Sequence, residues 1–211
     1  QGLAIGAKAK DSAIIEFPDV RRMLMTQKAY IEAARHLMLL NSATVDISTN
    51  HPDESVRTRA DEIVGILTPI CKSWGTDLGN ELTSIALQIH GGMGYIEETG
   101  AAQHYRDVRI AAIYEGTNGV QAADLVGRKL GVRRGSSFNE YISEIGSLDK
   151  ELAKAGKSFA SIRSNLADGV AALKKATGWM LRHGLQDPNS ILAGSSPYLR
   201  MWGETLGGWL L

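Results

Sequence analysis

At 211 residues, 44% of them hydrophobic, the chain is long enough to bury one large core or two smaller ones. Lys plus Arg and Asp plus Glu both number 23, so the formal net charge is zero, and bulk charge indicates neither a nucleic-acid-binding protein nor a polybasic membrane-binding one. No apolar run reaches the roughly 20 residues that span a bilayer, and the single Cys71 excludes an internal disulfide. These features predict a soluble globular protein of a reducing compartment, which we expect to be the cytoplasm.

The two ends of the chain predict a piece of a longer polypeptide. The sequence starts at Gln1 rather than at an initiator Met, and it ends in GETLGGWLL, an apolar segment without a polar or basic last turn. The lack of a signal peptide therefore carries little information about location.

Helical periodicity dominates the chain up to about residue 130. Residues 1–17 have no sustained period and are predicted to be a connecting segment. Beyond Pro18, apolar residues recur every three or four positions, while Pro69 predicts a kink or break and Gly75 with Thr76 predicts an interruption. The predicted helices are about 19–48, about 56–70, 77 to the double glycine at 91–92, and a fourth that Thr117 or Asn118 could cap and that runs to about Leu130.

The predicted fold class is all-α, because no segment before residue 130 alternates with the period of a strand. Four helices with short links predict an antiparallel four-helix-type bundle over residues 18–132. After the break GVRRGSSFNE, a long helix over about 159–183 and a last, incomplete helix from Pro197 predict a second, truncated helical domain over residues 137–211.

The densest glycine cluster is QIHGGMGYIEETG, residues 88–100. Gly91, Gly92 and Gly94 permit positive φ and close approach of a ligand to the backbone, which suits a phosphate or a dinucleotide. A plain helix terminator explains the same glycines. The spacing differs from the nicotinamide-binding fingerprint, and no predicted strand precedes it.

The histidines lack the spacing of metal ligands. His90 and His104 have no neighbours that would complete a ligand set, so we predict capping or hydrogen-bonding roles for them and no metal site. Cys71 is predicted to be a small buried apolar residue, and Arg106 and Asp107 are predicted to form local ion pairs or caps.

The stretch RIAAIYEGTNGVQ, residues 109–121, places Glu115 between an apolar segment and a Gly-Thr-Asn-Gly run typical of a helix start. A catalytic base needs a fixed backbone, partial shielding from water and nearby donors, and the free N–H groups of the following turn could supply the donors. From the local sequence alone, a solvated surface carboxylate explains Glu115 equally well.

The two motifs and the segment between them, QIHGGMGYIEETGAAQHYRDVRIAAIYEGTNGVQ, closely resemble the carboxyl-terminal helical domain of flavin-dependent acyl-CoA dehydrogenases. The glycine cluster, the Tyr-Arg-Asp-x-Arg segment and the Ile-Tyr-Glu-Gly-Thr segment have the family's order and separation, which is more specific than any one of them. Similarity to extended members of the family continues to both ends, and residues 137–211 resemble the start of their additional C-terminal helical domain.

The resemblance implies specific roles for residues of both motifs. Glu115 matches the base that removes the α-proton of an acyl-CoA thioester, its N–H matches a donor to the thioester carbonyl, and Gly116 matches a position near the thioester. FAD is the implied cofactor. The implied FAD-contacting residues form two segments. The first is Gln88, Ile89, His90, Gly91 and Gly92, which in the family often contacts the FAD across a subunit interface. The second is Thr117, Asn118 and Gly119. Gly119 departs from relatives that carry an amide there, which leaves only a backbone contact.

The resemblance also implies partners and leaves alternatives. It implies an acyl-CoA substrate, an electron-transferring flavoprotein as electron acceptor and a homo-oligomer, without nucleic acid or a membrane span. An acyl-CoA oxidase would use the same base, and a non-catalytic helical oligomerisation module is the alternative from another class. Because the family's amino-terminal helical domain and β-domain would lie before Gln1, residues 1–211 alone are expected to be inactive.

Overall fold

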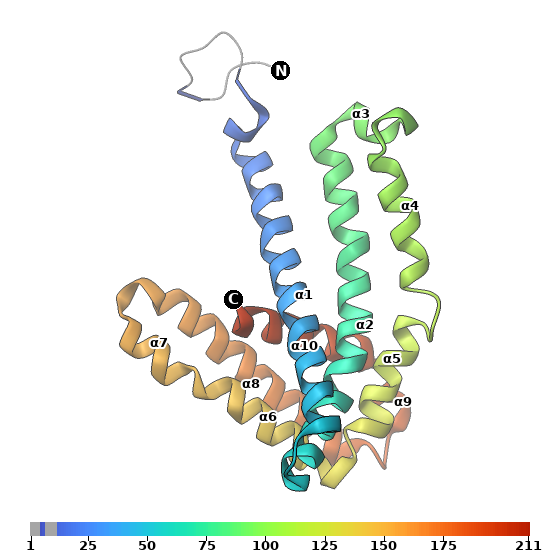
Figure 1. The fold of residues 1–211 in the computed structure, drawn as a ribbon, viewed down its shortest axis with the longest axis vertical. Coiled ribbons are helices and arrows are strands. Elements are labelled where there is room, and N and C mark those ends of the chain that lie inside the picture. The colour runs from blue at the N-terminus through green and yellow to red at the C-terminus, as the bar shows by residue number, and fades with distance from the viewer. Residues whose placement is uncertain (1–4, 7–11) are drawn as a thin grey trace.

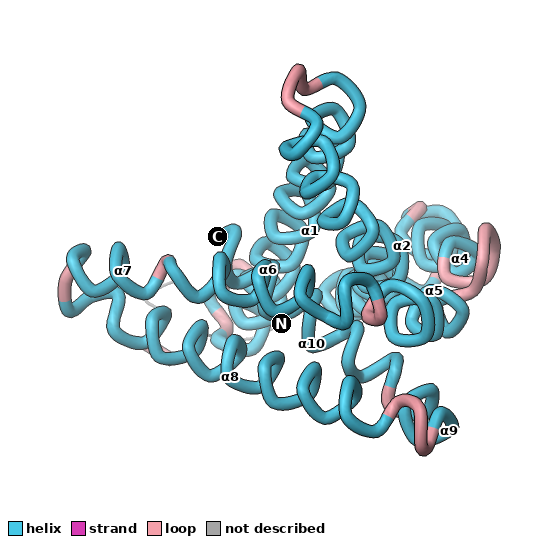
Figure 2. Tube along the Cα trace, turned by 90° about the horizontal axis from the view of Figure 1, so that it is seen from below, coloured by secondary structure: helices cyan, strands magenta, loops and turns pink. Residues whose placement is uncertain are grey.

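The structure is a computed structural model that describes residues 5–6 and 12–211, and within that range it contains helices and no strand. The all-α fold class is therefore confirmed (Figure 1, Figure 2). The elements up to residue 129 are η1 (Ile14–Glu16), α1 (Pro18–Asn50), α2 (Glu54–His90), α3 (Gly92–Tyr95), η2 (Glu97–Thr99), α4 (Ala101–Ala111), α5 (Asn118–Asp124) and the π-helical turn η3 (Leu125–Lys129). Those that follow are η4 (Val132–Gly135), α6 (Ser136–Ser147), α7 (Asp149–Ala155), η5 (Lys157–Phe159), α8 (Ala160–His183), α9 (Pro188–Ala193) and α10 (Ser195–Leu210).

Helices α1 and α2 form a long antiparallel hairpin on which the other elements assemble (Figure 1). Pro18 occupies the first turn of α1, where its missing N–H costs nothing, and Asp53 caps α2 by accepting the Ser55 N–H at 2.8 Å. Helices α4 and α5 pack against α2. Most of the predicted connecting segment, residues 1–17, lies outside the described residues, and the proposed domain limits stay predictions.

The predicted interruption at Gly75 and Thr76 is wrong, because α2 is one helix through both residues. Gly75 lies against α1, where an added Cβ would stand 3.1 Å from Met38 Cε, and the Thr76 hydroxyl donates to the Lys72 carbonyl within the helix at 2.7 Å. Pro69 is buried inside the same helix without breaking it. Packing against α1 outweighs the roughly 1 kcal/mol that a glycine costs a helix interior.

Helices α4 and α9 lie in segments for which no helical structure was predicted, while α6 and α7 lie at the start of the predicted second helical domain. Helix α4 contains the Tyr-Arg-Asp-x-Arg segment and packs along α2, so the four main helices of this region are α1, α2, α4 and α5 rather than those predicted. Helix α9 lies in a segment predicted to be a loop. It is short and has a cap, since the Asp187 carboxylate accepts the Ser190 N–H at 3.1 Å.

The core is continuous through both halves of the chain, because α10 packs against α1, α2 and α5 (Figure 1). Trp202 of α10 is completely buried, stacks on Tyr141 of α6 at 6.2 Å between ring centroids and meets Phe138 edge-on at 5.6 Å. Helices α6, α7 and α8 project away from the α1–α2 hairpin in Figures 1 and 2.

The chain turns sharply between η3 and α6. Arg133, Arg134 and Gly135 all have left-handed backbones, with φ of 46°, 57° and 85°. Two successive arginines in this conformation are unfavourable unless surrounding contacts impose it.

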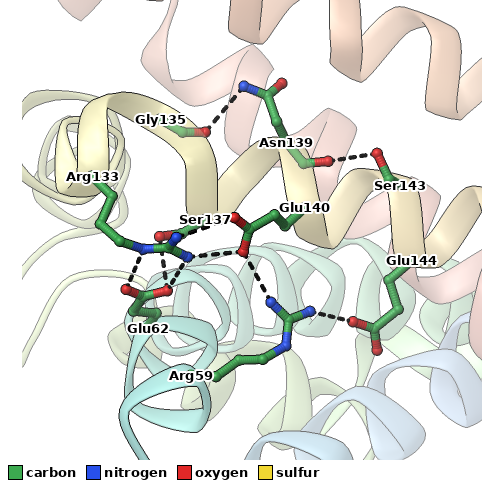
Figure 3. Close-up of polar contacts among 9 residues, drawn as sticks. All are labelled: Arg59, Glu62, Arg133, Gly135, Ser137, Asn139, Glu140, Ser143 and Glu144. Atoms are coloured by element: carbon green, nitrogen blue, oxygen red, sulfur yellow. Dashed lines mark hydrogen bonds and ion pairs between the residues drawn. The ribbon is translucent and has the colours of Figure 1, made fainter. Parts of the chain in front are cut away.

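The side chain of Arg133 belongs to an ion-pair network that connects the turn to α2 (Figure 3). The Arg133 guanidinium donates twice to Glu62 at 2.6 Å and also to Glu140 at 2.8 and 3.1 Å. Arg59 joins Glu140 at 3.1 Å and Glu144 at 2.7 Å. The network therefore connects the start of α6 to one face of α2.

Candidate functional site

The turn between α4 and α5 holds Glu115 in a left-handed backbone conformation, with φ of 55°, followed by Gly116 at φ 82°. For a non-glycine residue this conformation costs roughly 1–2 kcal/mol, so the neighbouring structure must impose it. The N–H of Asn118 closes the turn by donating to the carbonyl of Ala112 at 3.2 Å. Glu115 thus has the fixed backbone that a base requires.

The polar groups of Glu115 are available to a ligand. Among the described residues its N–H has no hydrogen-bond partner, and its carbonyl accepts from Gln121 Nε2 at 3.4 Å. The side chain is exposed, and the large apolar side chains near it in sequence are also about half exposed: Ile113 48%, Tyr114 50% and Val120 57%. The described residues therefore do not supply the partial shielding from water that a catalytic base needs.

Thr117 caps α5, which confirms one of the two predicted caps. Its Oγ1 accepts the Val120 N–H at 3.3 Å, and its carbonyl accepts the Gln121 N–H at 3.0 Å. At Gly119 an added Cβ would meet only Thr117 Oγ1, at 3.9 Å, so packing within this chain does not require a glycine there.

The side chain of Asn118 is turned toward α2. Its Oδ1 accepts from Lys72 Nζ at 2.8 Å, and its Nδ2 donates to Asp77 Oδ1 at 2.7 Å and to Thr76 Oγ1 at 2.9 Å. Since these bonds occupy both ends of the amide, the backbone of Asn118 is the part left for a cofactor contact.

The glycine cluster ends α2, as predicted. Gly91 has φ of 62°, and its N–H donates to the Gln88 carbonyl at 3.1 Å. Gly94 is required by packing, because a Cβ there would press on the Leu87 carbonyl. Gly92 has neither constraint: its φ is not positive, and no atom lies within 4 Å of a built Cβ.

The remaining residues of this segment lie at the end of α2. Gln88 and His90 are exposed and Ile89 is half-buried, and His90 Nδ1 lies 2.8 Å from the Ala86 carbonyl. His104, from α4, is also exposed. Over the described range, no group of three or more His, Cys, Asp or Glu side chains is placed to hold a metal ion.

The structure does not bring the two predicted segments together. Asn118 contacts Asp77, and an α-helix rises about 1.5 Å per residue, so the 11 positions from Asp77 to Gln88 separate the segments by about 16 Å along α2. Figure 1 shows the α2–α3 junction and the α4–α5 turn at different heights along this helix.

Sequence reasoning did not identify Lys72, Thr76 and Asp77 as site residues. Their spacing on α2 is the only signal in the sequence, and it is common to any polar helix face. The predicted ion pair of Arg106 is present, but its partner is Glu97 at 2.7 Å rather than a residue of its own helix.

Comparison with known proteins agrees with this fold. Residues 3–130 match the family model for the acyl-CoA dehydrogenase C-terminal domain, and residues 142–211 match one described as acetyl-CoA dehydrogenase C-terminal like. A structure of Caenorhabditis elegans ACDH-11 in complex with C11-CoA superposes with a TM-score of 0.72, covering 97% of this chain and 35% of that one. At 17% identity this likeness shows the fold alone.

Other proteins have a higher sequence identity to this chain. The chain is 39% identical to 3-methylmercaptopropionyl-CoA dehydrogenase of Ruegeria pomeroyi, over 100% of this chain and 36% of that protein. It is 35% identical to a butyryl-CoA dehydrogenase of Syntrophomonas wolfei, over 82% of this chain and 28% of that protein. The chain thus spans about a third of the length of these relatives, and it belongs to the acyl-CoA dehydrogenase family.

Proposed function

We propose that the full-length protein is an FAD-dependent acyl-CoA dehydrogenase in which Glu115 removes the α-proton of the thioester. The observation that carries this proposal is the turn at Glu115, where a left-handed backbone leaves the N–H of an exposed carboxylate residue without a partner among the described residues. Family membership supports the same role.

The α-proton of a thioester is too weakly acidic for a free carboxylate, so the negative charge on the carbonyl oxygen must be stabilised as the proton leaves. The Glu115 N–H is a suitable donor, and the carboxylate of the same residue accepts the proton. FAD, when bound, would take the β-hydrogen with its electron pair, which yields the α,β-unsaturated thioester. Gly116 follows the base directly and would lie near the thioester, and its positive φ favours a glycine at this position.

Gly92 and Gly119, one in each segment, leave space beside the backbone for a cofactor. Neither backbone conformation nor packing within the chain accounts for Gly92, while close approach by a ligand would. Because the two segments are about 16 Å apart along α2, we propose that Gln88, Ile89, His90, Gly91 and Gly92 contact the FAD of a neighbouring subunit. Thr117, Asn118 and Gly119 would contact the FAD served by Glu115 in the same subunit.

The names of relatives suggest the substrate and the electron acceptor. We propose a short acyl-CoA, since the relatives above act on 3-methylmercaptopropionyl-CoA and butyryl-CoA by name. Caffeyl-CoA reductase-Etf complex subunit CarC of Acetobacterium woodii, 31% identical over 117 residues, supports an electron-transferring flavoprotein as acceptor. No helix of the described chain could span a membrane. We propose a homo-oligomer in the cytoplasm.

The test is Glu115→Gln in the full-length protein, mixed without oxygen with butyryl-CoA. Gln preserves size but cannot accept the proton, so flavin reduction should slow by about 10²- to 10⁴-fold while thioester binding persists. Glu98→Gln, which changes another exposed glutamate, should reduce its flavin at the normal rate. A normal rate in the Glu115 variant would refute the assignment. Fast reoxidation of the reduced enzyme by air would favour an oxidase instead.

A further inference from the structure

The amide of Asn118 lies between a cation and an anion of the same helix. Its Oδ1 faces the Lys72 ammonium at 2.8 Å, and its Nδ2 faces the Asp77 carboxylate at 2.7 Å. Thr76 lies between these two on α2 and accepts from Nδ2 at 2.9 Å, while its own hydroxyl proton goes to the Lys72 carbonyl. The Ser73 carbonyl is a further acceptor for Nδ2 at 3.2 Å, so both polar atoms of the amide have partners of matching type.

This arrangement suits an amide better than a carboxylate or an apolar group. An aspartate at position 118 could accept from Lys72, but it would place a second negative charge against Asp77. An apolar side chain would leave both charged groups without their partner. The chemistry of the α2 face therefore selects asparagine.

The backbone of Asn118 performs a second task, since its N–H donates to Ala112 at the end of α4. Asn118 thus connects the end of α4 and the start of α5 to the middle of α2 by hydrogen bonds. Glu115 lies inside the turn that these bonds close, in a conformation that L-residues adopt only when surrounding contacts impose it.

Helix α10 lies over the same anchor. A small cavity of about 40 Å³ is bounded by Ser73, Asp77 and Asn118 on one side and by α10 on the other, where Arg200 pairs with Glu81 of α2 at 2.6 Å. The hydrogen bonds that join the amide to Lys72 and Thr76 are part-buried, which strengthens them relative to bonds in water, whereas the bond to Asp77 is exposed.

We propose that Asn118 is the positioning residue for Glu115: through Lys72, Thr76 and Asp77 it holds the left-handed turn that aims the base and its N–H at the substrate. This inference rests on the proposed function, in which Glu115 is the base. The side chain of Asn118 acts through Glu115 and does not touch the substrate.

The first measurement is hydrogen–deuterium exchange in the full-length protein, which does not depend on activity. Asn118→Ala should accelerate exchange of the hydrogen-bonded amides in residues 112–121, such as those of Asn118 and Gln121, by at least about tenfold, because the turn opens locally. Asn139→Ala is the matched control, since its amide bonds only the Gly135 carbonyl at 3.1 Å on α6. Acceleration spread equally over the whole protein, or none in residues 112–121, would overturn the anchor.

The second measurement separates positioning from stability. In Asn118→Ala, flavin reduction by butyryl-CoA should slow by about 10- to 100-fold, and the isotope effect of α-deuterated substrate should rise, because a misplaced base makes proton removal more limiting. A lower fraction of folded enzyme would leave the isotope effect unchanged, and that result would refute positioning.

Thr76→Val is the second variant, because it removes one hydroxyl from the anchor and nearly conserves volume. Thr76→Val should also accelerate exchange in the turn and raise the isotope effect, but by less than Asn118→Ala does. An unchanged exchange rate and isotope effect would contradict the proposal. If the wild-type enzyme dehydrogenates no acyl-CoA, the proposed function fails and with it the catalytic part of this inference. The exchange experiment still decides whether Asn118 holds the turn.

Discussion

Gly203 of α10 lies directly against the indole ring of Trp74 on α2. A Cβ on Gly203 would overlap the ring, and one on Gly207, a turn later, would stand 2.8 Å from Trp74 Cη2 and 3.1 Å from the Ala33 Cβ of α1. Trp74 is only 2% exposed. Gly203 and Gly207, four positions apart, therefore allow α10 to pack closely against α1 and α2.

The first prediction is that Gly203→Ala destabilises the full-length protein by about 1–3 kcal/mol, the usual cost of overpacking a close contact. Thermal unfolding should show this as a loss of several degrees in Tm. Gly208→Ala is the matched control in the same helix, because no atom lies within 4 Å of its built Cβ, and it should leave Tm unchanged or slightly higher. Equal losses for both variants would refute the packing argument.

The second prediction concerns acid stability. Hydrogen bonding from Arg133 lowers the pKa of Glu62 below its ordinary 4.5. The stabilisation is therefore complete above the unfolded-state value and is lost as pH falls through the lower folded-state value. Glu62→Gln should lower Tm near neutral pH, and the difference from wild type should shrink at about pH 3.

Glu151→Gln, an exposed change on α7, is the control for that experiment and should have little effect at either pH. A Tm difference for Glu62→Gln that stays constant down to low pH would mean that the ionised pair with Arg133 does not stabilise the turn before α6.

The third prediction is that Cys71 is unreactive in the native protein. Burial raises the pKa of its thiol to about 12, so the reactive thiolate is scarce near neutral pH. Alkylation followed by mass spectrometry should label Cys71 much faster in urea than in buffer. Leu37→Ala, which removes a buried side chain from the residue whose carbonyl lies 3.8 Å from the Cys71 sulfur, should increase labelling of the native protein. Equal rates in urea and buffer would count against burial.

The fourth prediction is that residues 1–211, produced alone, bind FAD weakly or not at all. The two segments lie about 16 Å apart along α2 and make few contacts with one FAD molecule. The free energy of so few contacts is smaller than the entropic cost of ordering a large ligand. Equilibrium dialysis with FAD should show the difference from the full-length protein. Stoichiometric FAD that survives purification of residues 1–211 would contradict the prediction.

The sequence determined the features that depend on local chemistry. The 3.6-residue period predicted helical structure, Pro18 predicted the start of α1, and Thr117 predicted a cap for α5. Gly91 predicted the end of α2, because a glycine accepts the positive φ that follows a helix. Each of these rests on interactions within a few residues, which are legible in one stretch of chain.

Only the tertiary structure decided what depends on residues far apart in the chain. Gly75 predicted a break, yet contact with Met38 of α1 keeps α2 continuous. The family resemblance implied that Glu115 is a base. Its left-handed backbone, and the bonds of Asn118 to side chains more than 40 positions earlier, appear only when α5 packs on α2. Local propensity amounts to about 1 kcal/mol or less per residue, so packing and hydrogen bonds between distant segments override it.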